Sequence, residues 1–173
     1  MYSLFFDKII KGFIRKEEYY SRRRWFLNGV LHRDKDKPAL ISYYTKEWWF
    51  KGRRHRDNLP AVLHSNCGEE WWFKGEKYKI KKFKDYVGTF DKHNRTISIN
   101  GNPSIVWDNG TKEWRDNGIL HRKKMPAIEY SNGDEEWWIY GMRHREDGPA
   151  VIYGNKQFWF EHGEFIKCMN CLE

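Results

Sequence analysis

The feature that most constrains this chain is a sequence motif that returns about every 23 residues. A Trp followed four residues later by Gly recurs at Trp25, Trp48, Trp71, Trp114, Trp137 and Trp159. In four units a His with an Arg directly behind it comes seven residues after the Trp, at His32, His55, His121 and His144. Because several residue types keep one order and nearly one spacing, the chain is predicted to be an array of one small unit.

Turn residues within each unit predict strands rather than helices. An aromatic segment, Glu-Trp-Trp-Phe or a variant of it, ends at a turn such as Asn28-Gly29 or Asn117-Gly118. Asn and Gly tolerate the positive φ that both central residues of a type I′ hairpin turn require. A second apolar segment begins at Pro-Ala and ends at another turn signal, such as Asn132-Gly133. We therefore expect an all-β fold, an antiparallel meander of β-hairpin repeats that forms an elongated, twisted sheet.

The repeats divide the chain into segments. We expect repeats 1–3 in residues 25–75, a divergent insertion that continues the third in 76–95, repeats 4–7 in 96–166, and a C-terminal tail in 167–173. Repeat 4 is shortened: Ile97 takes the Trp position, Gly101 the Gly position, and Pro103-Ser104 the place of Pro-Ala. Repeat 7 is a half unit.

Residues 1–24 precede the first repeat and are predicted to form an amphipathic helix that caps the sheet. Their apolar side chains fall near helical spacing, at Leu4, Phe5, Ile9, Phe13 and Ile14. Repeat arrays need a cap because an exposed sheet edge invites aggregation. A helix lying on a membrane surface and a helix that docks a partner are the alternatives.

The order of the motif resembles a MORN-type repeat. The succession Trp, Asn-Gly, His-Arg and Tyr-x-Asn-Gly-Asp is more narrowly similar to a Trp-rich "NGxLHRxDGPA" variant found in proteins of large DNA viruses, phages and some bacteria. The likeness covers residues 25–166, apart from the insertion at 76–95. It implies an elongated single-sheet scaffold that serves as an interaction module and has no catalytic residues of its own.

The recurrent His-Arg pair is interpreted as part of the scaffold. A catalytic His or a metal site would occur once, whereas this pair recurs at the same position in four units. Histidines about 10 Å apart along a sheet are too distant to share a metal ion, whose bonds to His are about 2 Å. We expect each His to hydrogen-bond a turn, and each Arg to pair with the Glu before a Trp or to lie across a Trp face. Contact with a ligand is the alternative. No catalytic residue, metal or cofactor is predicted.

The second Trp position of each unit is the predicted site of function. Successive strand residues point to opposite faces, so one face receives the first Trp of every unit. The other face receives Phe26, Trp49, Trp72, Arg115, Trp138 and Phe160. A single-layer sheet usually has one polar face. These six residues therefore either pack within a twisted sheet or form a stripe that binds a protein partner, a host factor if the chain is viral.

The alternative function is nucleic-acid binding through the basic N-terminal half, because the uneven charge does not fit a groove that runs the whole length. Residues 1–92 carry a net charge of +10 and residues 93–173 one of −2, for a total of +8. The basic residues that could contact a nucleic acid are Arg22, Arg23, Arg24, Lys79, Lys81, Lys82 and Lys84. Basic residues interleaved with aromatics, as in residues 77–86, can follow a phosphate backbone and stack bases. A Lys-protected edge strand or a solvated insertion shows the same pattern.

The remaining composition favours a cytoplasmic protein. Three Cys in 173 residues indicate a reducing compartment. Charged residues at Asp7, Lys8 and Lys11 interrupt any signal-peptide pattern, and no apolar stretch is long enough to span a membrane. Cys168-x-x-Cys171 is a lone pair and only a weak signal for zinc or redox chemistry. An unpaired strand at either end of the array could pair with its copy and form a homodimer.

Overall fold

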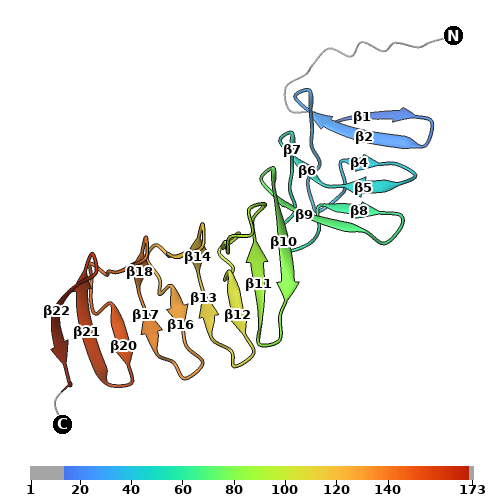
Figure 1. Cartoon of the computed structure of the whole chain (residues 1–173). Helices are drawn as coiled ribbons and strands as arrows, with labels where there is room; N and C mark the ends of the chain where they lie inside the picture. The colour runs from blue at the N-terminus through green and yellow to red at the C-terminus, as the bar shows by residue number, and fades with distance from the viewer. Residues whose placement is uncertain (1–13, 172–173) are drawn as a thin grey trace. The chain divides into compact units, whose positions relative to one another are not determined.

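The computed structural model describes residues 14–171, and all regular elements within them are β-strands (Figure 1). Sixteen of these strands belong to one open antiparallel meander, and the other six form three two-stranded hairpins. Within the described range no helix has the length and apolar character needed to span a membrane. The predicted all-β antiparallel meander is confirmed.

The chain divides into two compact units, and the first is Met1–Tyr78. Its strands are β1 (Ile14–Tyr19), β2 (Arg22–Leu27), β3 (Val30–Leu31), β4 (Leu40–Ile41), β5 (Thr45–Glu47), β6 (Trp49–Phe50), β7 (Arg53–Arg54), β8 (Val62–His64), β9 (Glu69–Phe73) and the start of β10 (Glu76–Lys82). The sheet order is β1-β2-β4-β5-β8-β9-β10, so sequence neighbours in the meander are also neighbours in space.

The second unit, Lys79–Glu173, repeats this arrangement. It contains the rest of β10, then β11 (Tyr86–Phe90), β12 (Ile105–Trp107), β13 (Lys112–Glu113), β14 (Arg115–Asp116), β15 (Ile119–Leu120), β16 (Ile128–Glu129), β17 (Glu135–Glu136), β18 (Trp138–Ile139), β19 (Met142–Arg143), β20 (Val151–Tyr153), β21 (Lys156–Glu161) and β22 (Glu164–Met169). Its order is β10-β11-β12-β13-β16-β17-β20-β21-β22.

Repeat 2 shows how one unit is built. β5 and β6 are a single aromatic segment that is interrupted at Trp48, where the strand changes its partner. The backbone N–H of Trp48 donates to the Ala61 carbonyl at 2.8 Å, and the Trp48 carbonyl accepts from His55 at 3.1 Å. Beyond Trp48 the chain turns back through β7 before it crosses to β8. The prediction of two strands per unit missed this short return strand.

The turn after the second aromatic position has the predicted type I′ backbone. Asn28 and Gly29 have φ values of 50° and 79°, and Asn117 and Gly118 have 50° and 86°. Both central residues therefore adopt the left-handed conformation that this turn requires. Other repeats place less suitable residues there before the Gly, with φ between 46° and 51°: Lys51, Lys74, Tyr140 and His162.

The helix predicted for residues 1–24 is wrong for residues 14–24, which belong to β1, β2 and the turn between them; residues 1–13 lie outside the described part of the chain. β1 pairs with β2 in a hairpin that places Glu17 opposite Arg24 and Glu18 opposite Arg23. Opposite charges that face each other across two strands favour this pairing. The strand β1 thus precedes the first repeat and continues its sheet by pairing with β2.

The core lies where the chain crosses from one hairpin to the next. The Ala of each Pro-Ala pair is fully buried: Ala39, Ala61, Ala127 and Ala150. The first Trp of the unit is also buried at Trp48, Trp114 and Trp137. In the shortened repeat Ser104 takes the Ala place, is 1% exposed, and donates its N–H to Glu113 as Ala61 does to Glu70. A small residue suits this position because the crossing chain leaves no room for a larger one.

Candidate interaction face

The Arg of each His-Arg pair lies flat across the first Trp of its own unit. The guanidinium carbon is 3.6–3.8 Å from the ring centroid in the pairs Arg33–Trp25, Arg56–Trp48, Arg122–Trp114 and Arg145–Trp137. Each guanidinium also donates to the carbonyl of the following Pro at 3.0–3.2 Å. Of the two partners expected for this Arg, the structure selects the Trp face. The stacked Arg ties the crossing segment to the core.

The His of the pair joins one repeat to the next. Its Nδ1 accepts a hydrogen bond from a backbone N–H in the following turn, at 3.1–3.3 Å, in the pairs His32–Lys51, His55–Lys74, His121–Tyr140 and His144–His162. The structure therefore contains the expected hydrogen bond between His and a turn, with the turn N–H as the donor. Among residues 14–171 no group of three or more His, Cys, Asp or Glu is placed to hold a metal ion.

The Glu before the Trp pair positions the second Trp. Glu47 accepts from Trp49 Nε1 at 3.0 Å and from Arg54 Nε at 3.1 Å. Equivalent indole bonds join Trp72 to Glu70 at 2.8 Å and Trp138 to Glu136 at 2.7 Å. The carboxylate thus fixes the ring orientation of a Trp that the core alone does not enclose.

In the first unit two of the predicted face residues are joined by a cation. Arg54 lies between the rings of Trp49 and Trp72, with its guanidinium carbon 5.2 Å and 5.1 Å from their centroids. Lys77 of β10 is opposite Trp72 in the strand register and continues the row, with its ammonium nitrogen 5.5 Å from the Trp72 ring centroid. The predicted Trp49 and Trp72 therefore belong to an alternating ladder of rings and cations, and each ring is half-buried.

The second unit repeats the ladder. Arg143 lies 5.1 Å from the Trp138 ring and 5.3 Å from the Phe160 ring. At Arg115 a guanidinium replaces the ring, and it donates to Glu113 at 2.8 Å and to the Gly118 carbonyl at 2.9 Å. Phe26, opposite Leu31 in its hairpin, holds the equivalent place in the first repeat. We use the name aromatic–arginine face for the residues at this position in each unit: Phe26, Trp49, Arg54 and Trp72 in the first unit, and Arg115, Trp138, Arg143 and Phe160 in the second.

Arg54 and Arg143 were missed by sequence reasoning, although a signal for them exists. Each lies two residues after the turn Gly and directly opposite the second Trp in the hairpin register. A two-residue type I′ loop fixes this register. Reading the register of the return strand, rather than only the alternation of the first strand, would have identified both residues.

Glu136 is only 2% exposed and accepts four side-chain hydrogen bonds. Its Oε1 accepts from Tyr130 at 2.9 Å and also from the Tyr153 hydroxyl, while Oε2 accepts from Trp138 and Arg143. Burial alone would raise the pKa of Glu136, but the hydrogen bonds from the two Tyr and the nearby Arg143 outweigh it and lower that pKa. Burial, and then Glu136, raise the pKa of Tyr130 and of Tyr153.

The basic residues considered for nucleic-acid binding come from two separate segments. Arg22–Arg24 are in β2, with Arg22 and Arg23 exposed. Lys79, Lys81 and Lys82 are exposed residues of β10, and Lys84 lies in the turn that leads to β11. Residues 79–82 pair with β11, so the insertion forms an additional hairpin of the meander.

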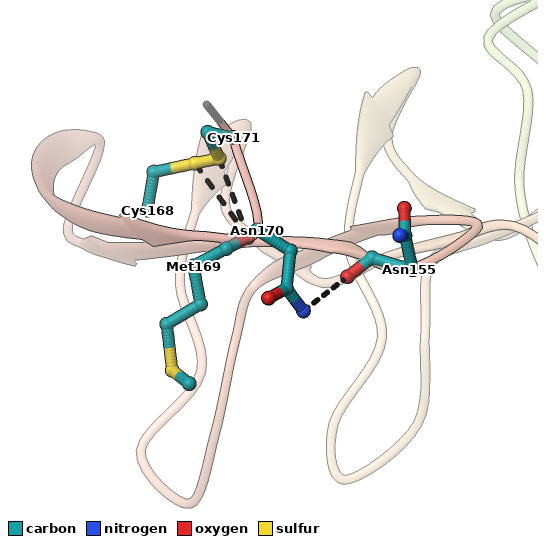
Figure 2. The surroundings of a disulfide bond; sticks show 5 residues. All are labelled: Asn155, Cys168, Met169, Asn170 and Cys171. Carbon is teal, nitrogen blue, oxygen red and sulfur yellow. Dashed lines mark hydrogen bonds between the residues drawn. A yellow bond between two sulfur atoms is a disulfide. The ribbon is translucent and has the colours of Figure 1, made fainter. Parts of the chain in front are cut away.

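The C-terminal Cys pair forms a disulfide. Cys168, in β22, is bonded to Cys171 just beyond it, and both sulfurs lie near the Met169 carbonyl oxygen, at 3.8 Å and 3.4 Å (Figure 2). Asn170 Nδ2 donates to the Asn155 carbonyl at 3.0 Å and ties this turn to the β20–β21 loop (Figure 2). Cys67 is exposed and has a free thiol.

Comparison of the chain with protein-family models, with curated proteins and with solved structures finds no match.

Proposed function

We propose that the protein is a non-enzymatic repeat scaffold that binds a protein partner through the aromatic–arginine face. The observation that supports this most is the ladder Trp49–Arg54–Trp72, in which half-buried rings alternate with a guanidinium at 5.2 Å and 5.1 Å. Trp and Arg are among the residues most enriched at the positions that dominate binding energies in protein interfaces.

The side chains of the face are already held in place before a partner arrives. Trp49 and Arg54 are both fixed by Glu47, and Trp138 and Arg143 are both fixed by Glu136. Ordering a flexible side chain at an interface costs about 0.5–1.5 kcal/mol. Because these rotamers are set by buried carboxylates, binding avoids most of that cost.

The chemistry of the face defines the partner it fits. The indole nitrogens already donate to Glu side chains, so the rings offer only apolar area to a partner. Arg54 and Arg143 each donate their Nε to a Glu and keep further guanidinium N–H donors for a partner. A complementary protein surface presents apolar side chains to the rings and carboxylate or carbonyl oxygens to the guanidinium groups.

The resemblance to MORN-type repeats supports the same proposal, since such arrays serve mainly as interaction modules. The partner we propose is a cellular protein, and a host protein if the chain is viral. The recurring scaffold roles of His and Arg leave the second Trp position as the part of the repeat that is available to a partner.

The test compares proteins captured from the native cell by three forms of the full chain. One form is unchanged, and one carries Trp49→Ala, Trp72→Ala and Trp138→Ala. The matched control carries Phe50→Ala, Phe73→Ala and Ile139→Ala, because these residues directly follow the three Trp in their strands and so point to the opposite face. Urea unfolding of all three forms establishes that each is folded.

We expect a partner that the unchanged chain and the control both capture, and that the Trp variant captures at least about tenfold less. The reason is that one or two anchor residues of an interface each contribute about 2 kcal/mol or more. The same partner is then purified and its dissociation constant measured for each form. Equal capture by all three folded forms would remove the aromatic–arginine face as the binding site.

A further inference from the structure

An open hollow of about 600 Å³ lies in the first unit, and none of the residues of the aromatic–arginine face lines it. Its walls come from the β1–β2 turn and the β4–β5 turn, which lie at the same end of that unit (Figure 1). Four tyrosines with largely exposed rings line it: Tyr19 (68% exposed), Tyr20 (86%), Tyr43 (78%) and Tyr44 (69%). Arg22 and Arg24 complete the wall together with Glu17.

The tyrosines are arranged as two pairs. Tyr19 and Tyr20 meet edge to face with ring centroids 4.4 Å apart, and Tyr43 and Tyr44 do so at 5.0 Å. Tyr20 has a φ of 50°, a conformation that costs energy for a large side chain and that Asn or Gly would adopt with less strain.

A second hollow, of about 240 Å³, adjoins the Tyr43–Tyr44 pair. Tyr43 and Tyr44 line both hollows, and Lys46 and His64 line the second. Neighbouring hairpins are about 10 Å apart, because each adds two strands to the sheet. The two tyrosine pairs therefore lie about one hairpin apart along the turn ends, with Arg22 and Arg24 beside the first pair and Lys46 beside the second.

We propose that these two hollows bind single-stranded nucleic acid. Exposed aromatic rings stack bases, and the guanidinium groups of Arg22 and Arg24 with the Lys46 ammonium bind the phosphates. The cations of the two walls outnumber the one carboxylate, Glu17. A duplex does not fit this chemistry, because its bases are stacked on one another and cannot reach the rings.

The test uses the full chain and a fluorescently labelled 12-nucleotide oligodeoxythymidine, followed by anisotropy between about 20 and 200 mM salt. Tyr20→Ser and Tyr43→Ser should each weaken binding about tenfold or more, since one base stacked on an aromatic ring contributes that much. Tyr20→Phe and Tyr43→Phe keep the ring and should stay within about twofold. The double variant Arg22→Gln and Arg24→Gln should reduce the slope of the logarithm of the binding constant against the logarithm of the salt concentration. The expected reduction is about 1.4, or about 0.7 for each phosphate that is no longer neutralised.

Matched controls lie elsewhere on the chain. Tyr140→Ser removes a ring that is also largely exposed, and Arg53→Gln an Arg that is also exposed, so both should bind like the unchanged chain. The triple Trp→Ala variant should also bind the oligonucleotide normally, which separates this proposal from the proposed protein-binding face.

Three results would overturn the proposal: no binding at 20 mM salt, equal binding of the thymidine–adenine duplex, or equal weakening in the Ser variants and in the controls. Displacement of the oligonucleotide by polyglutamate at matched charge would also overturn it, and would show an anionic protein segment as the ligand instead.

Discussion

The imidazole Nδ1 of His32 accepts a hydrogen bond from the backbone N–H of Lys51 in the next repeat, at 3.1 Å. His32 is 2% exposed, and its other nitrogen lies 3.0 Å from Asp34 Oδ1. An accepting Nδ1 carries no proton, so Nε2 is the nitrogen that donates to Asp34. In a repeat array each unit contacts only its neighbours, and such bonds decide how strongly adjacent repeats are coupled.

Replacing His32 by Ala should therefore lower the free energy of unfolding by about 1–3 kcal/mol, because it removes a buried acceptor and leaves the Lys51 N–H without it. His32→Asn places an amide oxygen near the former Nδ1 and should recover part of that stability. Urea unfolding followed by Trp fluorescence measures both changes.

Asp34→Ala is the matched control, because it removes only the exposed partner of the same ring. Its effect should stay below about 1 kcal/mol. An Asp34 variant as unstable as His32→Ala would show that the hydrogen bond to Asp34, and not the bond to Lys51, carries the stabilisation.

The Arg–Trp stack leads to a second prediction. Arg122→Lys keeps the charge but removes the planar group 3.6 Å above Trp114 and the bond to the Pro126 carbonyl. Lys cannot reproduce a stacked guanidinium, and the variant should lose about 1–2 kcal/mol of stability. Arg53→Lys, at an exposed position, should change the urea midpoint little. The prediction fails if the two substitutions have the same effect.

Glu136 predicts how stability responds to acid. Burial would raise its pKa, but the bonds from Tyr153, Tyr130 and Arg143 outweigh burial, so the pKa is lower in the folded chain than in the unfolded one. The carboxylate therefore stabilises the fold above the unfolded pKa of about 4.3, and this contribution disappears as the pH falls further toward the folded pKa. Glu136→Gln should show a smaller fall in stability between about pH 5 and 3 than the unchanged chain. The free energy of unfolding of both chains is measured with urea across that range. If it falls by the same amount in both, the prediction is wrong.

Tyr130 and Tyr153 predict a response at the alkaline end. Burial and the adjacent Glu136 raise the pKa of both phenols in the folded chain. The neutral phenols thus contribute stability that is complete below the unfolded value of about 10 and is lost as the pH rises above it. Substituting both by Phe should remove this alkaline decline while lowering stability at neutral pH. Unfolding measured from about pH 8 to 11 tests the difference, and an unchanged slope would assign the decline to other groups.

Several parts of the fold could be predicted from the sequence because local chemistry determines them. Asn-Gly at positions 28–29 and 117–118 specifies a turn by its backbone preference alone. Pro-Ala marks the start of the next strand, since the small Ala must fit under the crossing chain. The hydrogen bond between His and a turn could be predicted because the His-Arg pair recurs at the same position in four repeats.

Other parts depend on contacts between distant residues. Ile14 is the last residue of the apolar pattern at helical spacing, but Ile14–Tyr19 pairs with β2 and is therefore a strand. That pairing brings Glu17 opposite Arg24, which a single-segment pattern cannot show. The ladder was half-predicted: the rings follow from strand alternation, whereas Arg54 and Arg143 enter only through the return strand.

Turn geometry gives the last prediction. Lys51 has a φ of 49° at the first central position of a type I′ turn, where Asn adopts the left-handed conformation more readily. Lys51→Asn should raise the free energy of unfolding by about 0.5–1 kcal/mol, since the bond to His32 uses only the backbone N–H. Lys51→Gln removes the same charge without the backbone preference and should be close to neutral. If both substitutions stabilise equally, the gain comes from removing a positive charge, and the backbone argument is wrong.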